Sequence, residues 1–450
     1  MTIGEERSSG TAQAWEALGG APELALRVRH RGVGDLGQGP LPVAELARAT
    51  VAACGLAAGE LAAVRAGGGV EDVAPLVVDE GAVATAFVSE RHLRVEGRRA
   101  PVTFAPLSGF WRTADGWVRT HANYPHHEAA LVRALRLPSA TPEAVRAAVG
   151  GRTAVEVQEL AYGEGGLAVA VAREYGEPQP LLEPVRASGA RGRPLGAAPA
   201  GRPAAGVRVL DLTRVIAGPV ATRTLGLLGA DVLRIDPPGL PESDDAYADT
   251  GFGKRSALLD LAEAEDRAVF EGLLAEADVV VTGYRPGALE RYGFGARELL
   301  ERWPGLVVAE LCAWGWRARG PWAGRRGFDS LVQAGYGIAA ACGEPGGEPG
   351  VLPAQALDHG TGYLVAAGVL RALAQGGGRG LRFSLAGTAS WLVRGLGREP
   401  VGAGVGYSAE PWLRVTPSGY GVLRHAASPF GEWAVGPSRW GADRAGWLPR

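Results

Sequence analysis

The feature that most constrains the fold is a regular alternation of short apolar runs and helical patterns between residues 207 and 312. Val207–Leu212 (VRVLDL) is an apolar run typical of a buried parallel strand, and Gly218 and Pro219 then open a helical pattern that Gly229 ends. Further strands are predicted at residues 230–235, 256–261, 278–282 and 306–312, with helices at residues 262–277 and 287–303. This alternation predicts an α/β fold with a doubly wound, parallel, Rossmann-like sheet.

A Pro-, Gly-, Ala- and Arg-rich stretch divides the chain. Residues 184–206 show no apolar periodicity and are predicted to be a linker. Residues 1–183 before it are predicted to form a smaller α+β domain, with helices at residues 41–56, 82–92, 128–135 and 141–148 and a hairpin at residues 109–120. Residues 207–375 are predicted to be the Rossmann-like domain. Residues 376–450 are a Gly- and Trp-rich extension whose packing the pattern does not predict.

Composition and charge exclude several functional classes. The 450 residues carry a formal net charge of −2, so no basic field is available to hold nucleic acid. No uncharged apolar run reaches the roughly 18 residues of a membrane-spanning helix, and the first ten residues lack the apolar core of a secretory signal. The cysteines, Cys54, Cys312 and Cys342, are widely scattered, which fits a reducing cytoplasm. We expect a cytoplasmic protein without nucleic-acid or membrane partners.

Neither a nicotinamide cofactor nor a metal is expected. The turn after the first strand lacks G-x-G-x-x-G, and Arg214, Val215 and Ile216 obstruct the close backbone approach that a pyrophosphate needs. A different anionic ligand at the carboxyl ends of the strands stays open. Three histidines (His121, His126 and His127) have no neighbouring Cys or carboxylate except Glu128 to complete a ligand set, so surface or core histidines are the favoured interpretation.

Basic residues follow several predicted strands. Of the 46 basic residues only Lys254 is a lysine, which marks either a place where a compact charge is needed or a chance leftover. Most arginines are explained as solvated surface residues. A phosphate-rich ligand would require several basic residues directly after the ends of strands. The residues concerned are Arg214, Arg234, Lys254, Arg255, Arg285, Arg291, Arg325 and Arg326.

Asp358 is the candidate nucleophile. It lies between a Gly/Pro-rich loop and an apolar helix predicted at Tyr363–Leu373. One interpretation is a helix N-cap aspartate, worth about 1 kcal/mol to the helix. The other is a carboxylate kept ionised by the helix dipole, beside Gly360 and Gly362, whose backbone N–H groups a substrate carbonyl can approach. Local sequence leaves both interpretations open.

Six ordered motifs then carry a family resemblance. They run from Gly206 to Leu373 and read GVRVLDLTRVIAGPVA, LGADVLRID, GFGKRSALLDL, ADVVVTGYRPGALERYGFG, GFDSLVQAGYG and PAQALDHGTGYLVAAGVLRAL. The sequence resembles the class III coenzyme A (CoA) transferases, the formyl-CoA and carnitine-CoA transferase family, which also includes alpha-methylacyl-CoA racemase. The resemblance implies a transferase that moves CoA between an acyl-CoA and a small carboxylic acid, both bound as substrates, without a tightly bound cofactor. It also implies an interlocked homodimer.

The same resemblance assigns roles to residues. Asp358 matches the family's covalent aspartate. We predict nine CoA-binding residues. Eight match the family's CoA-binding positions, and Arg291 is added as a nearby basic residue. The nine are Arg214, Ile216, Ala217, Lys254, Arg255, Tyr284, Arg285, Arg291 and Arg326.

Three departures keep alternatives open. The segment that looks like the family's smaller domain precedes the nucleotide-binding part here, whereas it normally follows it. Ile216 replaces a polar residue of the formyl-CoA enzymes, and Phe328 replaces the histidine that serves the racemases as a base, so it cannot move a proton. A 2-methylacyl-CoA racemase and a non-catalytic CoA-ester-binding subunit are the alternative functions.

Overall fold

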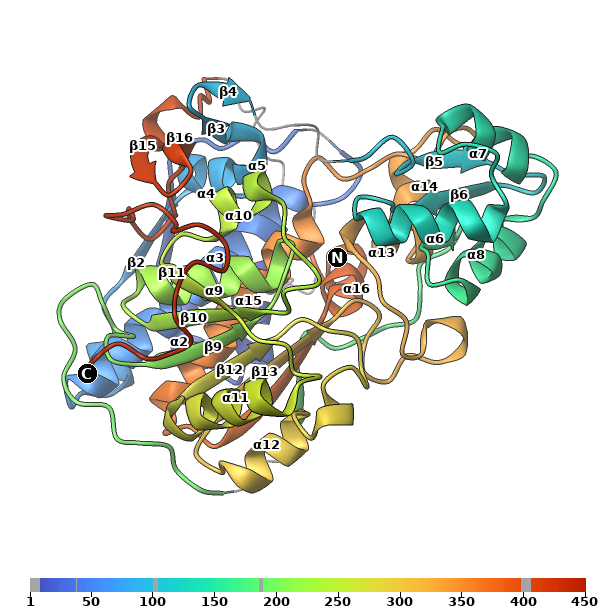
Figure 1. Cartoon of the computed structure of the whole chain (residues 1–450). Coiled ribbons are helices and arrows are strands. Elements are labelled where there is room, and N and C mark those ends of the chain that lie inside the picture. Colours follow the sequence, from blue (N-terminus) through green and yellow to red (C-terminus); the bar gives the residue numbers. More distant parts are fainter. Residues whose placement is uncertain (1–8, 38, 100–103, 186–188, 398–405) are drawn as a thin grey trace, which may run out of the picture.

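A seven-stranded sheet forms the centre of the computed structural model, which describes residues 9–37, 39–99, 104–185, 189–397 and 406–450 (Figure 1). Six strands are parallel, and β8 pairs antiparallel with β14 at one edge. The parallel sheet predicted from sequence is confirmed. The strand order is β11 (Lys254–Leu258), β10 (Asp231–Asp236), β9 (Arg208–Leu212), β12 (Val279–Thr282), β13 (Val307–Cys312), β14 (Arg379–Ser384) and β8 (Glu183–Val185).

Helices cover both faces of the sheet, which explains the continuous apolar strands. Val279 and Val281 of β12 point into one hydrophobic core, whereas Val280 between them points into a second core on the opposite face. The first core is covered by α9 (Ala217–Leu227) and α15 (Ala356–Ala374), and the second by α11 (Ala264–Glu276) and α12 (Ala296–Arg302). The predicted helix at 287–303 is wrong in its first half, because a 3₁₀ turn (Glu290–Tyr292) precedes α12.

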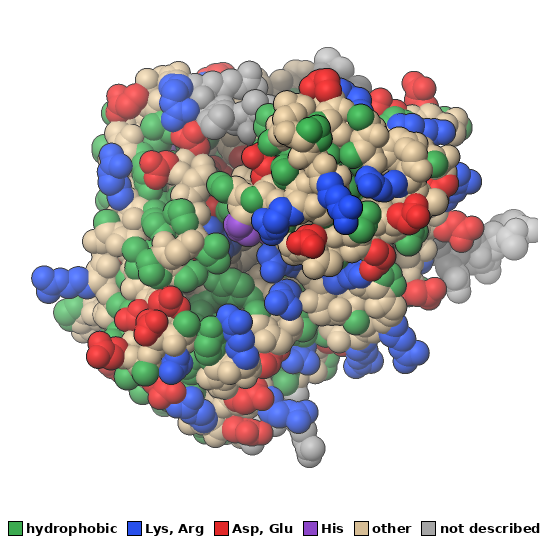
Figure 2. Space-filling view, turned by 45° about the vertical axis from the view of Figure 1, so that its right-hand side comes forward, with side chains coloured by type: hydrophobic (Ala, Val, Ile, Leu, Met, Phe, Trp, Pro, Cys, Tyr) green, Lys and Arg blue, Asp and Glu red, His purple; other side chains and the backbone are tan. Residues whose placement is uncertain are grey.

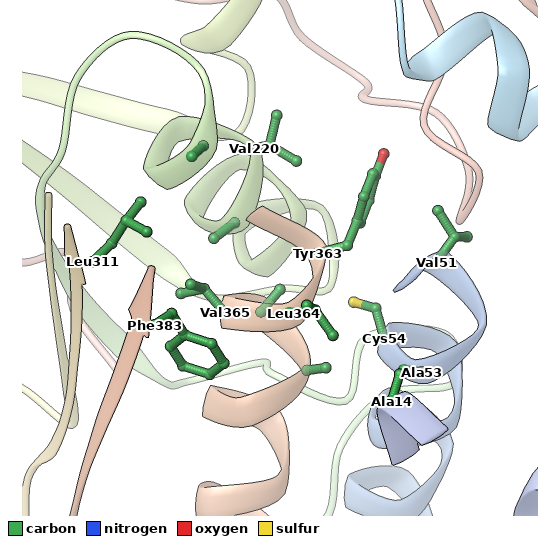
Figure 3. Close-up of a cluster of buried hydrophobic side chains, with 14 of the residues drawn as sticks. Ala14, Val51, Ala53, Cys54, Val220, Leu311, Tyr363, Leu364, Val365 and Phe383 are labelled. Atoms are coloured by element: carbon green, nitrogen blue, oxygen red, sulfur yellow. The ribbon is translucent and has the colours of Figure 1, made fainter. Parts of the chain in front are cut away.

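The N-terminal helices belong to the main body, which differs from the predicted domain boundary at residue 183. The helix α3 (Val43–Arg65) packs along α15, with Val51 and Cys54 next to Tyr363 and Leu364 in one core (Figure 3). This helix is also long and apolar enough, by length and composition alone, to cross a membrane. In the structure most of its residues are buried in the core.

A smaller α+β module, residues 104–173, has its own hydrophobic core and projects from the main body (Figure 1). The predicted hairpin is confirmed as β5 (Phe110–Arg112) and β6 (Trp117–Thr120), and β7 (Ala168–Ala170) completes an antiparallel sheet. Thr141 caps α7 (Pro142–Val149) as its sequence predicts. Because N-terminal helices precede the module in the main body, it is an insertion rather than an N-terminal domain. Its other helices are α6 (Pro125–Leu135) and α8 (Ala154–Gly163).

The C-terminal residues are integrated into the main body. The strand β14 and α16 (Leu385–Arg394) come from the predicted extension 376–450, and β8 begins just before the predicted linker 184–206 and ends inside it. A second antiparallel sheet joins β15 (Leu413–Ser418) and β16 (Gly421–Ala426) to β3 (Arg94–Val95) and β4 (Arg98–Arg99). The remaining elements are α1 (Gly10–Ala17), α2 (Pro22–Ala25), β1 (Val28–Arg31), β2 (Leu76–Asp79), α4 (Glu80–Ala86), α5 (Ser89–His92), α10 (Asp244–Thr250), α13 (Asp329–Gly335) and α14 (Ile338–Cys342), with 3₁₀ turns at Val70–Asp72, Gly320–Trp322 and Glu410–Trp412.

Candidate active site

Asp358 lies in the first turn of α15 and is almost completely enclosed. The helix begins at Ala356, earlier than predicted, and its N-cap residue is Gln355. Asp358 is therefore the third helical residue, and the interpretation of Asp358 as an N-cap is wrong. Only 5% of the residue is exposed. Neighbouring groups must therefore determine the charge of its carboxyl group.

The carboxylate of Asp329 holds the start of α15. Asp329 is the first residue of α13, and one of its oxygens accepts a hydrogen bond from the backbone N–H of Asp358 at 3.0 Å. The side-chain amide of Gln333, one turn further along α13, donates to the other oxygen. The amide oxygen of Gln333 in turn accepts from the backbone N–H of Leu352 at 2.9 Å. These bonds fix the amino ends of α13 and α15 against each other.

A third acidic residue reaches the same place from the N-terminal helices. Glu90 of α5 contacts the ring of His359, with 3.3 Å between Oε2 and Nε2, and His359 stacks on Phe87 with ring centroids 5.4 Å apart. Neither Asp329 nor Glu90 is among the site residues predicted from sequence. Asp329 belongs to the GFDSLVQAGYG motif, which was a usable signal, whereas no pattern links Glu90 to residues so far along the chain.

Burial and like charges favour the protonated form of Asp358. Burial raises the pKa of Asp358 well above its usual range, and the charges of Asp329 and Glu90 raise it further. Burial also raises the pKa of Asp329, to about 6, against the hydrogen bonds that it accepts. Burial opposes ionisation of Glu90 as well, but the hydrogen bond and charge of His359 outweigh it and lower the pKa of Glu90. The expectation that the helix dipole keeps Asp358 ionised is therefore wrong for the free protein.

The two glycines after Asp358 serve helix packing. A Cβ added to Gly362 would lie 2.5 Å from the backbone oxygen of Ala217, at the start of α9. Gly360 faces Leu46 of α3. Both glycines lie inside α15, so the expectation that they open backbone N–H groups to a substrate is wrong. They instead let two neighbouring helices approach α15 closely.

A crevice for a ligand is expected where β9 and β12 lie side by side. The chain runs from β9 to β10 on one side and places β12 on the other, which creates a topological switch point at the carboxyl ends. In the turn after β9, Val215 has a φ of 71°, a left-handed conformation that a β-branched residue rarely adopts. Ile216 is the N-cap residue of α9 and Ala217 begins the helix. Strain of this kind concentrates at ligand-binding turns, and Arg214 lies in the same turn.

Three of the predicted CoA-binding arginines gather at this edge of the sheet. Burial lowers the pKa of Arg326, and the charge of Arg285 lowers it further. Burial, followed by the charges of Arg326 and Arg214, lowers the pKa of His126. Arg285 is exposed, and Tyr284 beside it is half-buried. Figure 2 shows a hollow in the surface with hydrophobic side chains on its floor and Lys or Arg side chains and a histidine at its border.

The module contributes side chains to the same edge. The guanidinium of Arg214 lies 5.5 Å from the ring centroid of Tyr124, whose hydroxyl donates to Glu242 at 3.0 Å. A terminal nitrogen of Arg326 lies 3.2 Å from Nε2 of His127. The sequence favoured surface or core histidines in the run THANYPHH, and nothing in it predicted a place at this edge. Among the described residues, no group of three His, Cys, Asp or Glu side chains is arranged to hold a metal ion.

The structure does not bring the backbone of two other predicted CoA-binding residues, Lys254 and Arg255, to this edge. Lys254 and Arg255 begin β11, at the opposite end of its strand. The Lys254 ammonium is fully buried and lies 3.0 Å from the carboxylate of Asp211, and burial lowers its pKa to about 8. Arg255 pairs with Asp231 at 2.7 Å. Arg291 is exposed in the 3₁₀ turn that connects the carboxyl end of β12 to α12, and no contact of its side chain with the other arginines is seen among the described residues.

Two cavities lie away from Asp358. One of about 590 Å³ borders the first residues of β10 and β11, including Asp231 and Lys254. The other, of about 370 Å³, borders Asp278 before β12 and the C-terminal end of α15. Both lie at the amino-terminal edge of the sheet, where ligands of such folds do not ordinarily bind.

Comparison with known proteins agrees with the motifs. Residues 205–402 match the model of CoA-transferase family III, so this segment belongs to that family, and the resemblance seen in the sequence is confirmed. The acetyl-coenzyme A transferase nodX of Hypoxylon pulicicidum is 37% identical over 206 residues, which cover 44% of this chain and 34% of that protein. A formyl-CoA:oxalate CoA-transferase of Rhodopseudomonas palustris strain HaA2 is 34% identical over 195 residues, which cover 40% of this chain and 45% of that protein.

A solved structure is also similar to part of this chain. The crystal structure of Rv3272 from M. tuberculosis is 33% identical and matches 41% of this chain and 54% of its own, with a TM-score of 0.39. The chain thus spans about a third to a half of the length of the relatives whose sequences it matches.

Proposed function

We propose that this protein transfers CoA from an acyl-CoA to a carboxylic acid, with Asp358 as the covalent nucleophile. The observation that carries the proposal is the position of Asp358. Its motif matches the one that carries the family's aspartate, and it lies enclosed at the start of α15 beside Asp329 and Glu90. Perturbed carboxyl groups that gather in this way are typical of functional sites.

The chemistry consists of four exchanges at carbonyl carbon. Asp358 must first lose its proton to solvent, because burial and its acidic neighbours raise its pKa. A carboxylate oxygen of Asp358 then attacks the donor thioester, the C–S bond breaks, and CoA leaves as a thiolate, which gives a mixed anhydride. The thiolate attacks the aspartyl carbonyl and releases the donor acid, which leaves CoA bound to Asp358 as a thioester. The acceptor carboxylate attacks this thioester and again releases the thiolate. The thiolate then attacks the acceptor carbonyl, which forms the new acyl-CoA and frees Asp358.

The turn after β9 connects the proposed CoA site to Asp358. Ala217, which begins α9 at the switch point, contacts Gly362, one helical turn beyond Asp358. Arg285 and Arg326 supply positive charge at the same edge, as the phosphates of CoA require, whereas Arg214 beside them is paired with Asp236 and Glu242. We therefore assign the nucleotide end of CoA to these arginines and the thioester end to Asp358.

Intact-protein mass spectrometry tests the proposal. The protein is mixed with formyl-, acetyl- and longer acyl-CoA esters, with hydroxylamine added to trap the activated aspartyl group. We expect a covalent adduct or a hydroxamate on Asp358 that is absent from Asp358→Asn. CoA binding without an adduct or turnover would favour the non-catalytic alternative, and full transferase activity of Asp358→Ala would reject the scheme.

A second candidate, epimerisation of a 2-methylacyl-CoA, is favoured by one observation. The ring of His121 stacks on Phe328 with centroids 4.0 Å apart, so an imidazole lies next to the position where the racemases have their histidine. Burial lowers the pKa of His121 to about 3, so the imidazole is neutral but only a weak base, which counts against this reaction. Uptake of deuterium at the α-carbon of a 2-methylacyl-CoA in heavy water distinguishes this reaction from transfer.

The homodimer and the cytoplasmic location stay predictions. Light scattering during size-exclusion chromatography measures the first, because a dimer has twice the mass of the 46.5 kDa chain.

A further inference from the structure

Arg119 is a buried cation at the boundary between the module and the main body. It lies on β6, directly opposite Phe110 of β5 and Val169 of β7. Val118 before it points into the core of the module, whereas Val169 belongs to the core of the main body. Because side chains alternate along a strand, Arg119 lies on the face of the small sheet that meets the main body.

Arg119 differs from the other buried arginines in lacking a carboxylate partner. It is 6% exposed, and among the described residues no hydrogen bond or ion pair involves its guanidinium, whose Nε is enclosed without a partner. Phe104 and Phe110 lie against it, with ring centroids 4.7 and 4.8 Å from the guanidinium carbon. The other arginines that are equally buried each pair with a carboxylate: Arg208, Arg223, Arg234 and Arg371.

Aromatic contacts alone do not account for this arrangement. Two ring faces offset only part of the free energy needed to take a guanidinium out of water, so buried charges are ordinarily paired. Burial lowers the pKa of Arg119 to about 10, and the charge of Asp329 partly counteracts this. Arg119 therefore keeps its charge at neutral pH without a protein partner, as expected of a cation whose partner is a ligand.

The position of Arg119 relates it to the proposed nucleophile. Asp329, the carboxylate whose charge acts on Arg119, is the residue that accepts the backbone N–H of Asp358. His121, two residues after Arg119 on the same face of the chain, stacks on Phe328 beside Asp329. A carboxylic acid that approaches Asp358 meets the charges of Asp329 and Glu90 as well, so its binding requires a cation at this place.

We propose that Arg119 binds the carboxylate of the acid that exchanges CoA with Asp358, between the module and α13. This inference rests on the proposed transfer reaction for its role but not for the binding itself. A planar guanidinium binds a carboxylate through two parallel hydrogen bonds. The ligand class is therefore a small carboxylate, and Arg119 is the residue that selects for its charge.

The test measures binding of acids without any turnover. Oxalate, succinate and acetate are each titrated into the CoA-free protein by calorimetry, in the wild type, Arg119→Gln and the control Arg112→Gln. Arg112 is exposed on the neighbouring strand β5. We expect at least one acid to bind, with a Kd raised about tenfold or more in Arg119→Gln, which is a loss of about 1.4 kcal/mol. The control should bind like the wild type.

Two results overturn the proposal: equal Kd values in wild type and Arg119→Gln, or no saturable binding of any of the three acids by the wild type. Arg119→Met, which suits apolar surroundings, replaces the Gln variant if that does not fold. The covalent adduct on Asp358 is measured separately. Binding that depends on Arg119 without an adduct would reject the transfer reaction but keep the carboxylate site. An adduct without such binding would reject the carboxylate site but keep the transfer reaction.

Discussion

The carboxylate of Asp329 accepts the backbone N–H of Asp358 at 3.0 Å, so one acidic side chain anchors the helix turn that carries the other. The same carboxylate raises the pKa of Asp358 through its charge, second only to burial. Asp329 therefore has two separable effects on the site, one through its hydrogen bonds and one through its charge. Substitutions that remove one effect and keep the other can measure each.

Asp329→Asn should move the pH dependence of the Asp358 chemistry to lower pH. The asparagine oxygen still accepts the backbone N–H of Asp358, its NH2 group can no longer accept from Gln333, and the negative charge that raises the pKa of Asp358 is gone. The measurement is the rate of adduct formation with an acyl-CoA as a function of pH. Asp329→Ala should show the same shift together with a loss of about 1 kcal/mol of stability, because the helix start loses its acceptor. An unchanged acidic limb in both variants would contradict the coupling.

Asp358→Asn should stabilise the protein increasingly as pH rises. An unfolded aspartate loses its proton near pH 4, whereas the folded Asp358 keeps its proton to a much higher pH. The folded state then binds more protons, so wild-type stability falls as pH rises above about 4 until the folded group ionises. The variant lacks this loss. Thermal unfolding at pH 4 and pH 8 should give similar Tm values at the lower pH and a higher Tm for Asp358→Asn at pH 8. A wild type that gains Tm relative to the variant between these pH values would refute the prediction.

The parallel sheet was predictable from sequence because its strands are buried on both faces. Continuous apolar runs such as VVVT at β12 mark such strands regardless of what surrounds them. Strand β8 was missed because a three-residue edge strand with a proline, Glu183–Val185, has no such pattern. The domain boundary predicted at residue 183 differs from the structure for another reason. Helix α3 was predicted, but nothing in its periodicity tells which other helix it will pack against.

The site was predictable only where a motif carried it. Asp358, Arg214, Arg285 and Arg326 were found through motifs. Lys254 belongs to a motif too, yet it lies at the start of its strand and forms an ion pair with Asp211. A linear pattern does not reveal this pairing. Glu90 and Arg119 come from segments far from the motifs, and their roles depend on tertiary contacts with α15 and α13. Sequence spacing contains no information on such contacts.

Gly362→Ala should destabilise the protein more than Gly360→Ala. A methyl group at Gly362 would lie 2.5 Å from the backbone oxygen of Ala217, so α9 and α15 must separate. At Gly360 the closest atom is 3.4 Å away and belongs to the flexible side chain of Leu46. Overpacking of the first kind typically costs 1–3 kcal/mol. Urea unfolding of both variants measures the difference, and equal midpoints would show that the α9–α15 contact is not tight.

Lys254→Met should lower the stability of the protein, whereas Arg285→Gln should weaken its binding of acyl-CoA. Lys254 and Asp211 form a fully buried pair, so removal of the ammonium leaves a buried carboxylate without its cation, at a cost of about 3–5 kcal/mol. Arg285 is exposed at the carboxyl edge, where its loss should leave the unfolding midpoint within experimental error and raise the KM for an acyl-CoA about tenfold. Urea unfolding and steady-state kinetics on both variants separate the two roles. A large stability loss in Arg285→Gln, or an unchanged midpoint in Lys254→Met, would reverse the assignment of these two cations.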